Sequence, residues 1–480
     1  MDAAALVSWV YTGILLFMVM HGFHRLFLAA VALGARRPVA AEPPMVWPKV
    51  TVQLPIYNER DVVLRCLRSI ASLEYPRELL EIQVLDDSTD DTADLVIQEV
   101  RRLSERGVHI VRIHRSDRVG FKAGALQQGL QWASGELIAI FDADFVPSSD
   151  FLLQVVPHVR PETGMVQTRW GHLNADSWLT RAQSVALDAH FSVEHVARQR
   201  LGQFFNFNGT AGIWRRSAIE AAGGWSSATL TEDLDLSYRA QLAGWKFLYL
   251  DHVVTPGELP SDMASFKSQQ FRWAKGAIQC AWRLLPKVIA SSLPWKIKLE
   301  ALFHLTANLG YPVSLGLALL LPVVLVLRMM GDRGGSSWWD VGCLSLTVAS
   351  MLAYHLVAFI RVGRPVWRRL LDLPIAMAMG LGLAVSQTRA VIEGCSGDVG
   401  EFVRTPKRGS ANRSSYPTGR TQGSWLELAL GLVISAVSVF AVADGAFRII
   451  PFVTLFSVGY VMVGWASWPN GAKPARSGSR

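Results

Sequence analysis

Long apolar runs on both sides of a polar segment restrict the folds open to this chain. The runs cover residues 3–20 (continued by 26–34), 302–327, 341–360, 426–443 and 449–468. Each approaches the ~20 apolar residues that a helix needs to cross a membrane. Residues 46–285 are rich in charge, although only 18% of the whole chain is charged, against roughly 25% in soluble proteins. The sequence therefore predicts a membrane protein with a large water-soluble part.

The basic residues predict which side of the membrane each segment faces. Arg25, Arg36 and Arg37 follow the first run, so its far end is expected in the cytoplasm. Segment 371–392 is ambiguous because it contains Pro374 and two glycines. If it crossed, the basic residues after it would face outside: Arg404, Lys407, Arg408, Arg413 and Arg420. We therefore expect five crossings and one interfacial helix, with six crossings as the alternative.

Cysteine and histidine patterns do not predict a metal centre. Four cysteines, Cys66, Cys280, Cys343 and Cys395, lie far apart and form no CxxC, which disfavours a disulfide framework or a zinc site. His190 and His195 are five residues apart, unlike the i, i+4 spacing of helical zinc ligands. The formal net charge of +8 is interpreted as cytoplasmic loops against anionic membrane lipids, and no nucleic-acid partner is expected.

The polar segment alternates between expected strands and expected helices. Short apolar runs at 49–55, 81–85, 109–113 and 137–141 predict strands, and 61–73, 92–106 and 122–133 predict helices. This alternation favours an α/β domain with a largely parallel sheet covered on both faces. Ligands bind at the carboxyl ends of such strands, where the acidic clusters of this sequence lie. No GxGxxG or Walker A sequence is present, which disfavours a dinucleotide enzyme or a P-loop ATPase.

Two carboxylates follow the last of these strands. Asp142 and Asp144 are two residues apart, so in an extended chain their side chains share a face. Such a pair suits a hard divalent cation that would neutralise a diphosphate leaving group. The alternative is a solvated turn after a strand.

Two further motifs follow along the chain. Thr231-Glu-Asp233 opens a predicted helix, either as a capping box or with Asp233 as a general base. Gln269-Gln-Phe-Arg272-Trp273 lies on a predicted helix, either as a plain interfacial helix or with Arg272 on phosphate and Trp273 stacked on a sugar.

The order of the motifs identifies a family. PIYNE (55–59), DDSTDDT (86–92), GFKAGAL (120–126), DAD, TED and QQFRW follow one another at domain-scale intervals. In this the chain resembles the inverting family 2 glycosyltransferases, specifically their membrane-embedded cellulose synthase-like branch, which includes mannan synthases. FNGTAGIWRR (207–216) looks like an acceptor-side loop, and FVRTPK (402–407) like a gating loop in which Arg404 departs from the usual valine.

The resemblance implies a fold and a division of the chain. The expected fold is a cytosolic GT-A (Rossmann-like) glycosyltransferase domain inserted between transmembrane α-helices. The expected parts are a transmembrane helix (1–36), the catalytic domain (46–260), interfacial helices with QxxRW (261–298), two transmembrane helices plus an interfacial helix (299–395), a gating-type loop (396–423), two transmembrane helices (424–468) and a basic cytosolic tail (469–480).

The resemblance also implies roles for single residues. Asp233 would be the catalytic base, and Asp142 and Asp144 would hold Mg²⁺ or Mn²⁺. The nucleotide-sugar donor would contact Tyr57, Glu59, Asp86, Asp87, Lys122, Asp142, Arg272 and Lys407. The acceptor, a growing glycan or a lipid, would contact Asn208, Gly209, Thr210, Glu232, Gln269 and Trp273.

These expectations combine into one functional hypothesis. The chain would polymerise glucose or mannose from UDP-glucose or GDP-mannose into a β-glycan, with inversion, and pass the polymer through its own helices. A bacterial inner membrane with a cytoplasmic catalytic domain is the expected location. A lipid glycosyltransferase that adds one sugar is the alternative, and a non-catalytic transporter or scaffold is a remote one. The sequence leaves the donor, the linkage and any partner subunit open.

Overall fold

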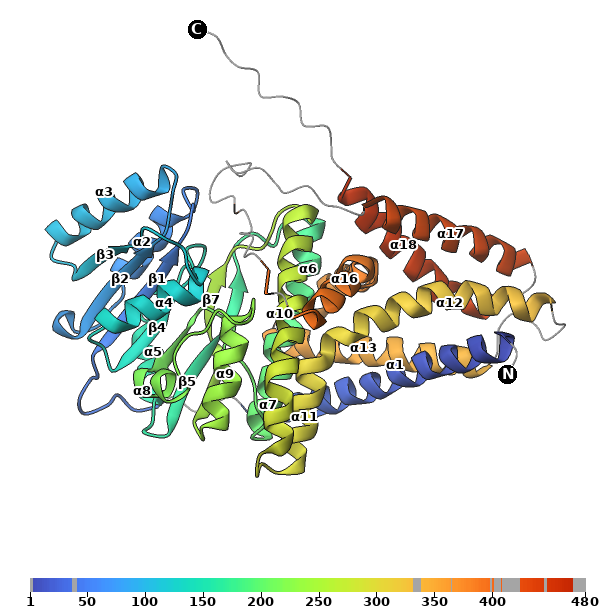
Figure 1. The fold of residues 1–480 in the computed structure, drawn as a ribbon, viewed down its shortest axis with the longest axis horizontal. Helices are drawn as coiled ribbons and strands as arrows, with labels where there is room; N and C mark the ends of the chain where they lie inside the picture. The colour runs from blue at the N-terminus through green and yellow to red at the C-terminus, as the bar shows by residue number, and fades with distance from the viewer. Residues whose placement is uncertain are drawn as a thin grey trace, which may run out of the picture.

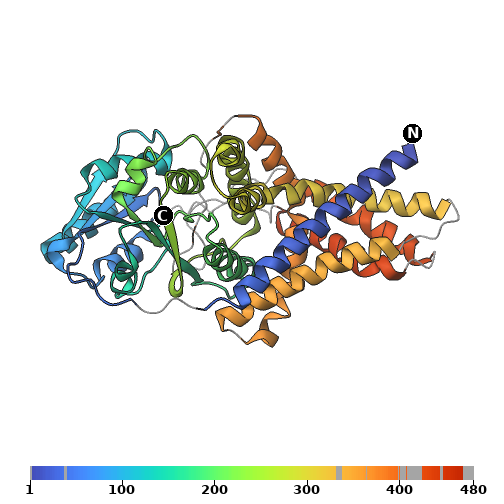
Figure 2. The ribbon, with the colours of Figure 1, turned by 90° about the horizontal axis from the view of Figure 1, so that it is seen from below.

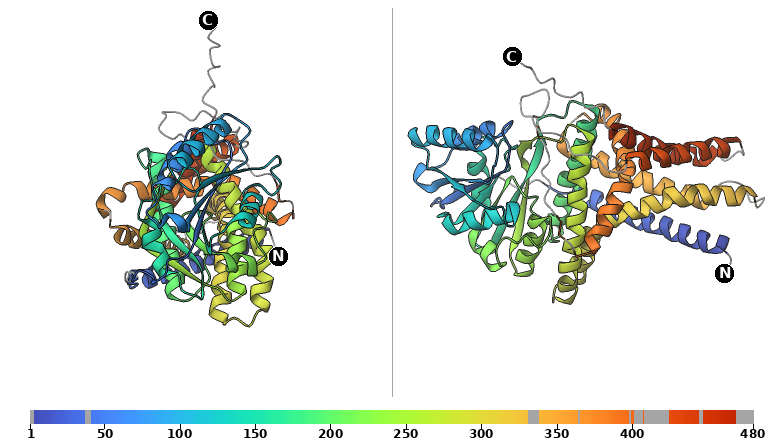
Figure 3. Two further views of the ribbon diagram at one scale, coloured as in Figure 1. Left: turned by 90° about the vertical axis from the view of Figure 1, so that its left-hand side faces the viewer. Right: turned by 45° about the horizontal axis from the view of Figure 1, so that its top comes forward.

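The computed structural model of the protein describes residues 3–36, 41–330, 338–363, 365–397, 399–400, 407, 424–443 and 447–468. An α/β domain lies at one end of the molecule and a bundle of long apolar helices at the other (Figure 1). A layer of helices that includes α6 (Trp178–Ala189) and α10 (Met263–Ala290) lies between them (Figure 3, right). The water-soluble domain is therefore inserted between helices as the sequence predicts.

The first half of the sheet follows the sequence-based expectation. Strands β1 (Val50–Ile56), β2 (Leu80–Asp86), β3 (Ile110–His114) and β4 (Leu137–Ile140) pair in parallel in the order β3-β2-β1-β4. Helices α2 (Val63–Ala71), α3 (Thr92–Glu105) and α4 (Phe121–Trp132) connect them. All four residues of β4 are buried, alternately in the hydrophobic clusters on the two sides of the sheet. This explains its continuous apolar sequence, because a strand covered on both faces has no polar side.

The second half of the sheet is mixed rather than parallel. Strands β5 (Thr163–His172), β6 (Gly212–Arg215) and β7 (Lys246–Gly257) complete the order β3-β2-β1-β4-β6-β5-β7. Strand β6 runs antiparallel to both neighbours, whereas β5 and β7 are parallel to each other. The expectation of a largely parallel sheet is therefore confirmed, since four of the six strand pairs are parallel, and antiparallel β6 makes the part of the sheet nearest the membrane helices mixed.

Helices carry the chain from this sheet to the bundle. They are α5 (Phe151–Val155), α6, the π-helical turn η3 (His190–His195), α7 (Val196–Arg200), α8 (Arg216–Ala221), α9 (Glu232–Leu242), α10 and α11 (Trp295–Thr306). Short 3₁₀ turns are η1 (Arg77–Leu79), η2 (Val156–His158), η4 (Ala307–Leu309) and η5 (Phe447–Ile449). Helix α9 begins at the cavity described below, and α10 passes over that cavity with the QxxRW residues in its first turns.

Four helices in the described part of the chain are long and apolar enough to cross a membrane, by length and composition. They are Ala5–Leu33, Trp295–Leu327, Trp338–Val362 and Phe447–Ala466. These correspond to α1 (Ala3–Leu33), α11 with α12 (Gly310–Met330), α13 (Trp338–Val362) and α18 (Ile450–Ala466). Figure 2 shows α1 and α13 running side by side along the bundle. All four spans were expected.

The remaining apolar segments are less regular. The predicted crossing 426–443 is α17 (Ser424–Ala443), whose apolar stretch Trp425–Phe440 is short for a span. The short helix α14 (Val366–Arg369) precedes the predicted interfacial segment 371–392. This segment forms two helices, α15 (Asp372–Gly382) and α16 (Ala384–Cys395), with a bend of 47° between them. If the bent pair is one span, the described helices give five candidates.

Buried ion pairs join the α/β domain, the intermediate helices and the bundle. Arg361 at the end of α13 pairs with Asp251 of β7 at 2.6 Å, and Lys267 of α10 pairs with Glu427 of α17 at 2.6 Å. All four side chains are nearly buried. Breaking such a pair leaves an uncompensated charge, which typically costs about 3–5 kcal/mol. The cavity between the two parts is therefore held in a defined geometry.

Candidate active site

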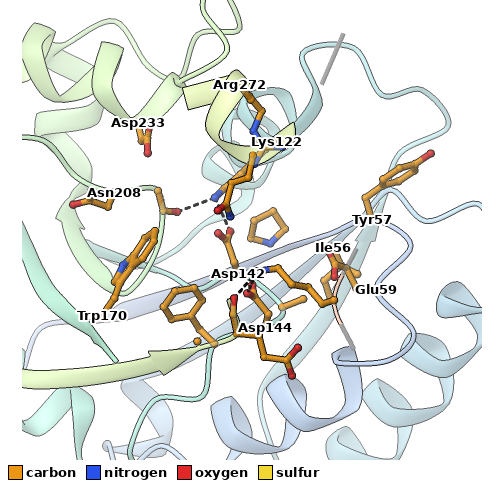
Figure 4. A pocket seen from close by; sticks show the side chains of 18 of the residues that line it. Ile56, Tyr57, Glu59, Lys122, Asp142, Asp144, Trp170, Asn208, Asp233 and Arg272 are labelled. Carbon is orange, nitrogen blue, oxygen red and sulfur yellow. Dashed lines mark hydrogen bonds and ion pairs between the residues drawn. The ribbon is translucent and has the colours of Figure 1, made fainter. Parts of the chain in front are cut away.

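An open cavity of about 1300 Å³ lies where the carboxyl ends of β1, β2 and β4 meet the start of α9, beneath α10. Fourteen of the sixteen residues proposed from the sequence line it: Tyr57, Glu59, Asp87, Lys122, Asp142, Asp144, Asn208, Gly209, Glu232, Asp233, Gln269, Arg272, Trp273 and Lys407. Figure 4 shows the acidic and basic side chains converging in it. The order of motifs along the sequence therefore corresponds to one site in space.

Lys122 neutralises the acidic centre of the cavity. It lies in the first turn of α4, and its Nζ is 2.6 Å from Asp142 Oδ1 and 3.9 Å from Glu232 Oε1. Nζ also donates to the Gly209 carbonyl oxygen at 2.9 Å. Burial alone would lower the pKa of Lys122, but Asp142 and Glu232 raise it above its usual value. Burial raises the pKa of Asp142 despite this ammonium group. The centre is thus a buried, charge-balanced cluster that suits an anionic ligand.

A second lysine covers the other carboxylate of the pair. Lys407 Nζ lies 2.7 Å from Asp144 Oδ2 and donates to the Glu258 carbonyl oxygen at 2.7 Å. Of the motif that resembles a gating loop (402–407), the structure describes Lys407, whereas Arg404 and Thr405 lie outside the described residues. Two ammonium groups therefore face Asp142 and Asp144 where a diphosphate would need positive charge.

Helix α9 begins at Glu232, next to Asp233, without the capping box that was the alternative to a general base. Thr231 holds the N-cap position but makes no side-chain capping bond, and its hydroxyl lies 3.5 Å from Cys280 Sγ. Asp233 Oδ1 instead accepts from the Leu234 amide at 2.8 Å. Burial and the neighbouring Glu232 carboxylate raise the pKa of Asp233 to about 7. A carboxylate with this pKa is suited to accept a proton near neutral pH.

This pKa predicts the pH dependence of any reaction that uses Asp233 as a base. The base works deprotonated, so the rate should rise with pH through an apparent pKa near 7. Glu232→Gln removes one negative charge beside Asp233 and should move this acid limb to lower pH, whatever it does to the maximal rate. Initial rates measured from pH 5 to 9 test this. An acid limb at the same pH in both proteins would show that Asp233 is not the titrating group.

The acceptor-side loop approaches Asp233 through a glycine. Gly209 has φ +81°, and a Cβ at this position would lie 3.0 Å from Asp233 Oδ2 and 3.4 Å from Lys122 Nζ. Thr210, by contrast, is fully buried, and its hydroxyl accepts from the Asp142 amide at 2.9 Å. Thr210 therefore supports Asp142 from behind the cavity wall rather than lining the cavity as expected.

Gly209→Ala should reduce turnover about tenfold to a hundredfold. The added Cβ would displace the Asp233 carboxylate, and a shift of ~1 Å at a reacting group lowers the rate by this factor. Gly202→Ala is the matched control: Gly202 has φ +64° but nothing within 4 Å of its Cβ position. Both variants carry the strain of alanine in the left-handed region, so their melting temperatures should fall similarly. Equal activity losses in both would contradict a steric effect on Asp233.

The outer end of the cavity has features of a nucleotide site. The Arg118 guanidinium lies 3.2 Å from the centre of the Tyr57 ring, a cation–π contact, and Arg115 forms an ion pair with Asp87. Asp86, expected beside Asp87, does not line the cavity. It is fully buried, paired with Arg112 at 2.8 Å. Adjacent strand residues point to opposite faces, so only one of the two can face the cavity.

Aromatic side chains line the membrane-facing side. Trp170 at the end of β5 lies with its ring centroid 5.1 Å from Phe145 and 6.4 Å from Trp273 of α10. Such surfaces bind sugar rings. Five further cavity residues were not predicted from the sequence: Arg118, Phe145, Trp170, His172 and Glu258. For Trp170 the reason is that β5 was not predicted.

Part of the chain is similar in sequence to known glycosyltransferases. Residues 48–276 match the family described as "Glycosyltransferase like family 2". Glucomannan 4-beta-mannosyltransferase 9 of Arabidopsis thaliana is 46% identical over 237 residues, 48% of this chain and 44% of that protein. Probable glucomannan 4-beta-mannosyltransferase 11 of Oryza sativa subsp. japonica is 44% identical over 250 residues, 51% of this chain and 44% of that protein. The chain thus spans about half the length of these relatives.

One solved structure supports the fold. Mannosyltransferase PcManGT from Pyrobaculum calidifontis, in complex with GDP-Man and Mn²⁺, superposes with a TM-score of 0.52 at 23% identity, covering 74% of this chain and 96% of that one. The mixed sheet with acidic side chains at its strand ends therefore has a GT-A-like fold, and it is joined to apolar helices long enough to cross a membrane. Residues 48–276, just under half of the chain, are likewise similar in sequence to glycosyltransferase family 2. The two matched relatives named above are plant proteins, so they do not support the expected bacterial inner membrane.

Proposed function

We propose that the protein is an inverting β-mannosyltransferase that uses GDP-mannose to extend a β-linked glycan. One observation carries the proposal. Asp233, Lys122 and Asp142 converge in one cavity within a segment that is 40–46% identical to proteins named glucomannan 4-beta-mannosyltransferases. Mannose is chosen over glucose because of these relatives and because the solved structure with a similar fold is a complex with GDP-Man.

In the proposed reaction Asp233 acts as the single base. It takes the proton from the acceptor hydroxyl as that oxygen attacks the anomeric carbon, and the bond from this carbon to the diphosphate oxygen breaks. The electron pair leaves with GDP, and the configuration inverts in one displacement. Lys122, Arg272 and Lys407 stabilise the departing negative charge from around the cavity. This reaction needs no covalent intermediate, so one positioned carboxylate suffices.

Asp142 and Asp144 fit a divalent cation as part of its ligand set. Carboxylate oxygens are preferred ligands of Mg²⁺ and Mn²⁺. In the described part of the chain no third His, Cys, Asp or Glu joins them to complete a metal site. The diphosphate would therefore supply the remaining ligands. A bound cation would neutralise the leaving diphosphate, and Lys407 would move from Asp144 to the phosphate oxygens.

Passage of the product through the protein is part of the proposal. A second cavity, with about 1490 Å³ of open space, lies among α1, α12, α13, α15 and α18. Leu187 of α6 lines the first cavity and the adjacent Ala186 lines the second, so one helix separates them. Basic residues such as Arg36 at the domain end of α1 favour a cytoplasmic catalytic side. A glycan made at Asp233 would enter the membrane past α6.

The test uses purified full-length protein in detergent with Mn²⁺ or Mg²⁺. GDP-mannose and UDP-glucose are offered separately, and diphosphate release and product size are measured. GDP release with a long mannanase-sensitive product, abolished by EDTA, is the expected result. A chloroform-soluble product with one sugar would replace the polymer proposal by a lipid glycosyltransferase. UDP release from UDP-glucose alone would overturn the choice of mannose.

A further inference from the structure

A π-helical turn lies behind the acceptor side of the cavity. This turn, η3 (His190–His195), joins α6 to α7. In an α-helix, side chains five residues apart differ in direction by about 140°. A π-helix closes its hydrogen bonds over i→i+5 and is frequent at functional sites. The imidazole centroids of His190 and His195 are 4.5 Å apart. The spacing that disfavoured a zinc pair therefore produces two adjacent histidines.

The two histidines hold the side-chain amide of Asn208 from both sides. His195 Nε2 lies 2.7 Å from Asn208 Oδ1 and 3.2 Å from the Asn206 carbonyl oxygen, two acceptors, so this nitrogen carries the hydrogen. His190 Nδ1 lies 3.1 Å from Glu194 Oε2 and donates to it. His190 Nε2 is then the acceptor for Asn208 Nδ2 at 3.0 Å. Rotating the amide by 180° would set donor against donor and acceptor against acceptor, so its orientation is fixed.

This arrangement leaves Asn208 with one hydrogen for a ligand. The Nδ2 group has two N–H bonds, and His190 takes one of them. Asn208 also lines the cavity, and Figure 4 shows it between Asp233 and Trp170. The backbone amide of Asn208 is itself held by Gln167 Oε1 at 2.9 Å. A fixed donor therefore stands beside the base, on the side where a sugar would stack on Trp170.

The histidines are in turn held by charged residues between the domain and the membrane helices. Glu194 accepts from Arg198 at 3.1 Å and from the Tyr354 hydroxyl of α13 at 2.8 Å. Arg198 also pairs with Glu300 of α11 at 2.9 Å, and Glu300 pairs with His24 of α1 at 2.7 Å. Although burial raises the pKa of Glu194, Arg198 and His190 hold it well below its usual range. Glu194 is therefore a stable anion that fixes the Nδ1–H form of His190.

We propose that His190 and His195 are positioning residues that orient Asn208 to donate a hydrogen bond to the attacking sugar of the acceptor. This inference rests on the proposed function, since it names how that site holds its acceptor. The π-helical turn places the two histidines, and the Glu194–Arg198–Glu300 chain connects them to three membrane helices. Asn208 touches the acceptor, whereas the histidines act only through Asn208.

The test compares His190→Leu with His190→Gln. Glutamine can place its Oε1 where His190 Nε2 lies and accept from Asn208, whereas leucine cannot. With a β-mannan oligosaccharide as acceptor, His190→Leu should lower kcat/KM for the acceptor about tenfold or more. GDP affinity, measured by calorimetry, should stay within about twofold, and His190→Gln should recover most of the loss. In an Asn208→Ala background, His190→Leu should cost nothing further, because it acts through Asn208.

Two kinds of result would contradict this inference or the function on which it rests. The positioning role is overturned, while the proposed function stands, if His190→Leu and His190→Gln both have the wild-type kcat/KM for the acceptor. It is also overturned if the factors by which His190→Leu and Asn208→Ala lower kcat/KM multiply in the double variant. Wild-type protein that transfers no mannose overturns the proposed function, and this inference with it. If His190→Leu does not fold, Tyr354→Phe substitutes for it: loss of one hydroxyl bonded to Glu194 should raise the acceptor KM and leave GDP affinity unchanged.

Discussion

Replacing Asp233 with asparagine should lower mannosyl transfer by about 10²–10⁴-fold, the usual contribution of a positioned general base. Asparagine keeps the shape of the side chain and an oxygen that can accept from the Leu234 amide, so α9 should begin as it does now. The variant loses the ability to accept a proton. GDP affinity should therefore remain close to that of the wild type, and transfer measured from GDP-mannose should nearly disappear.

Asp235→Asn is the matched control for this experiment. Asp235 lies on the same helix but is fully buried and pairs with Arg239 at 2.7 Å, away from the cavity. This change should lower the melting temperature without removing turnover from the molecules that fold. Full activity in Asp233→Asn, or an equal loss in both variants, would mean that another group removes the proton.

The sequence predicted the half of the sheet in which local pattern and final environment agree. Strand β4 is covered on both faces, and its sequence is uniformly apolar. Strand β5 is also mostly buried, but it contains Gln167 and Thr168, which bond to the backbone around Ala211. In the sequence alone such polar side chains indicate a solvent-exposed segment, because their hydrogen-bond partners lie in distant parts of the chain. The mixed half of the sheet and Trp170 could not be predicted for this reason.

The candidate site shows the same division. Motif order was enough to predict which residues meet, because family motifs cluster where strands end. It could not separate Asp86 from Asp87, which depends on which face each side chain takes. It also could not assign His190 and His195. Residues five apart point in different directions in an α-helix and lie side by side only in a π-helical turn. Local geometry, rather than residue type, decided these cases.

The lysines explain how the cavity tolerates several carboxylates before any donor binds. Asp142, Glu232 and Asp233 all affect the pKa of Lys122, which is the ammonium group nearest to the cavity centre. Lys407 forms an ion pair with Asp144 at 2.7 Å. An unpaired buried charge is costly, so these carboxylates require such partners. The same positive charges then face the diphosphate, and the residue that stabilises the empty cavity also contributes to leaving-group departure.

Lys122→Met should consequently lower transfer by about 10²–10³-fold, the cost of removing one preorganised charge that faces a developing anion. The variant also leaves Asp142 and Glu232 without their ammonium partner, so the pKa of each carboxylate should rise. Affinity for GDP should fall more than affinity for GMP, because Lys122 is expected to contact the β-phosphate. Calorimetric titration with both nucleotides measures this difference directly.

The control for this variant is Lys246→Met, the same chemical change outside the cavity. Lys246 is exposed at the start of β7, whereas the cavity residue Gly257 lies at the end of this strand. It should leave transfer and both nucleotide affinities unchanged. Lys122→Arg should recover GDP binding only in part, because a planar guanidinium cannot occupy the position of an ammonium held 2.6 Å from Asp142 and 2.9 Å from the Gly209 carbonyl oxygen. GDP and GMP affinities that fall by the same factor in Lys122→Met would show that Lys122 stabilises the carboxylates but does not contact the terminal phosphate.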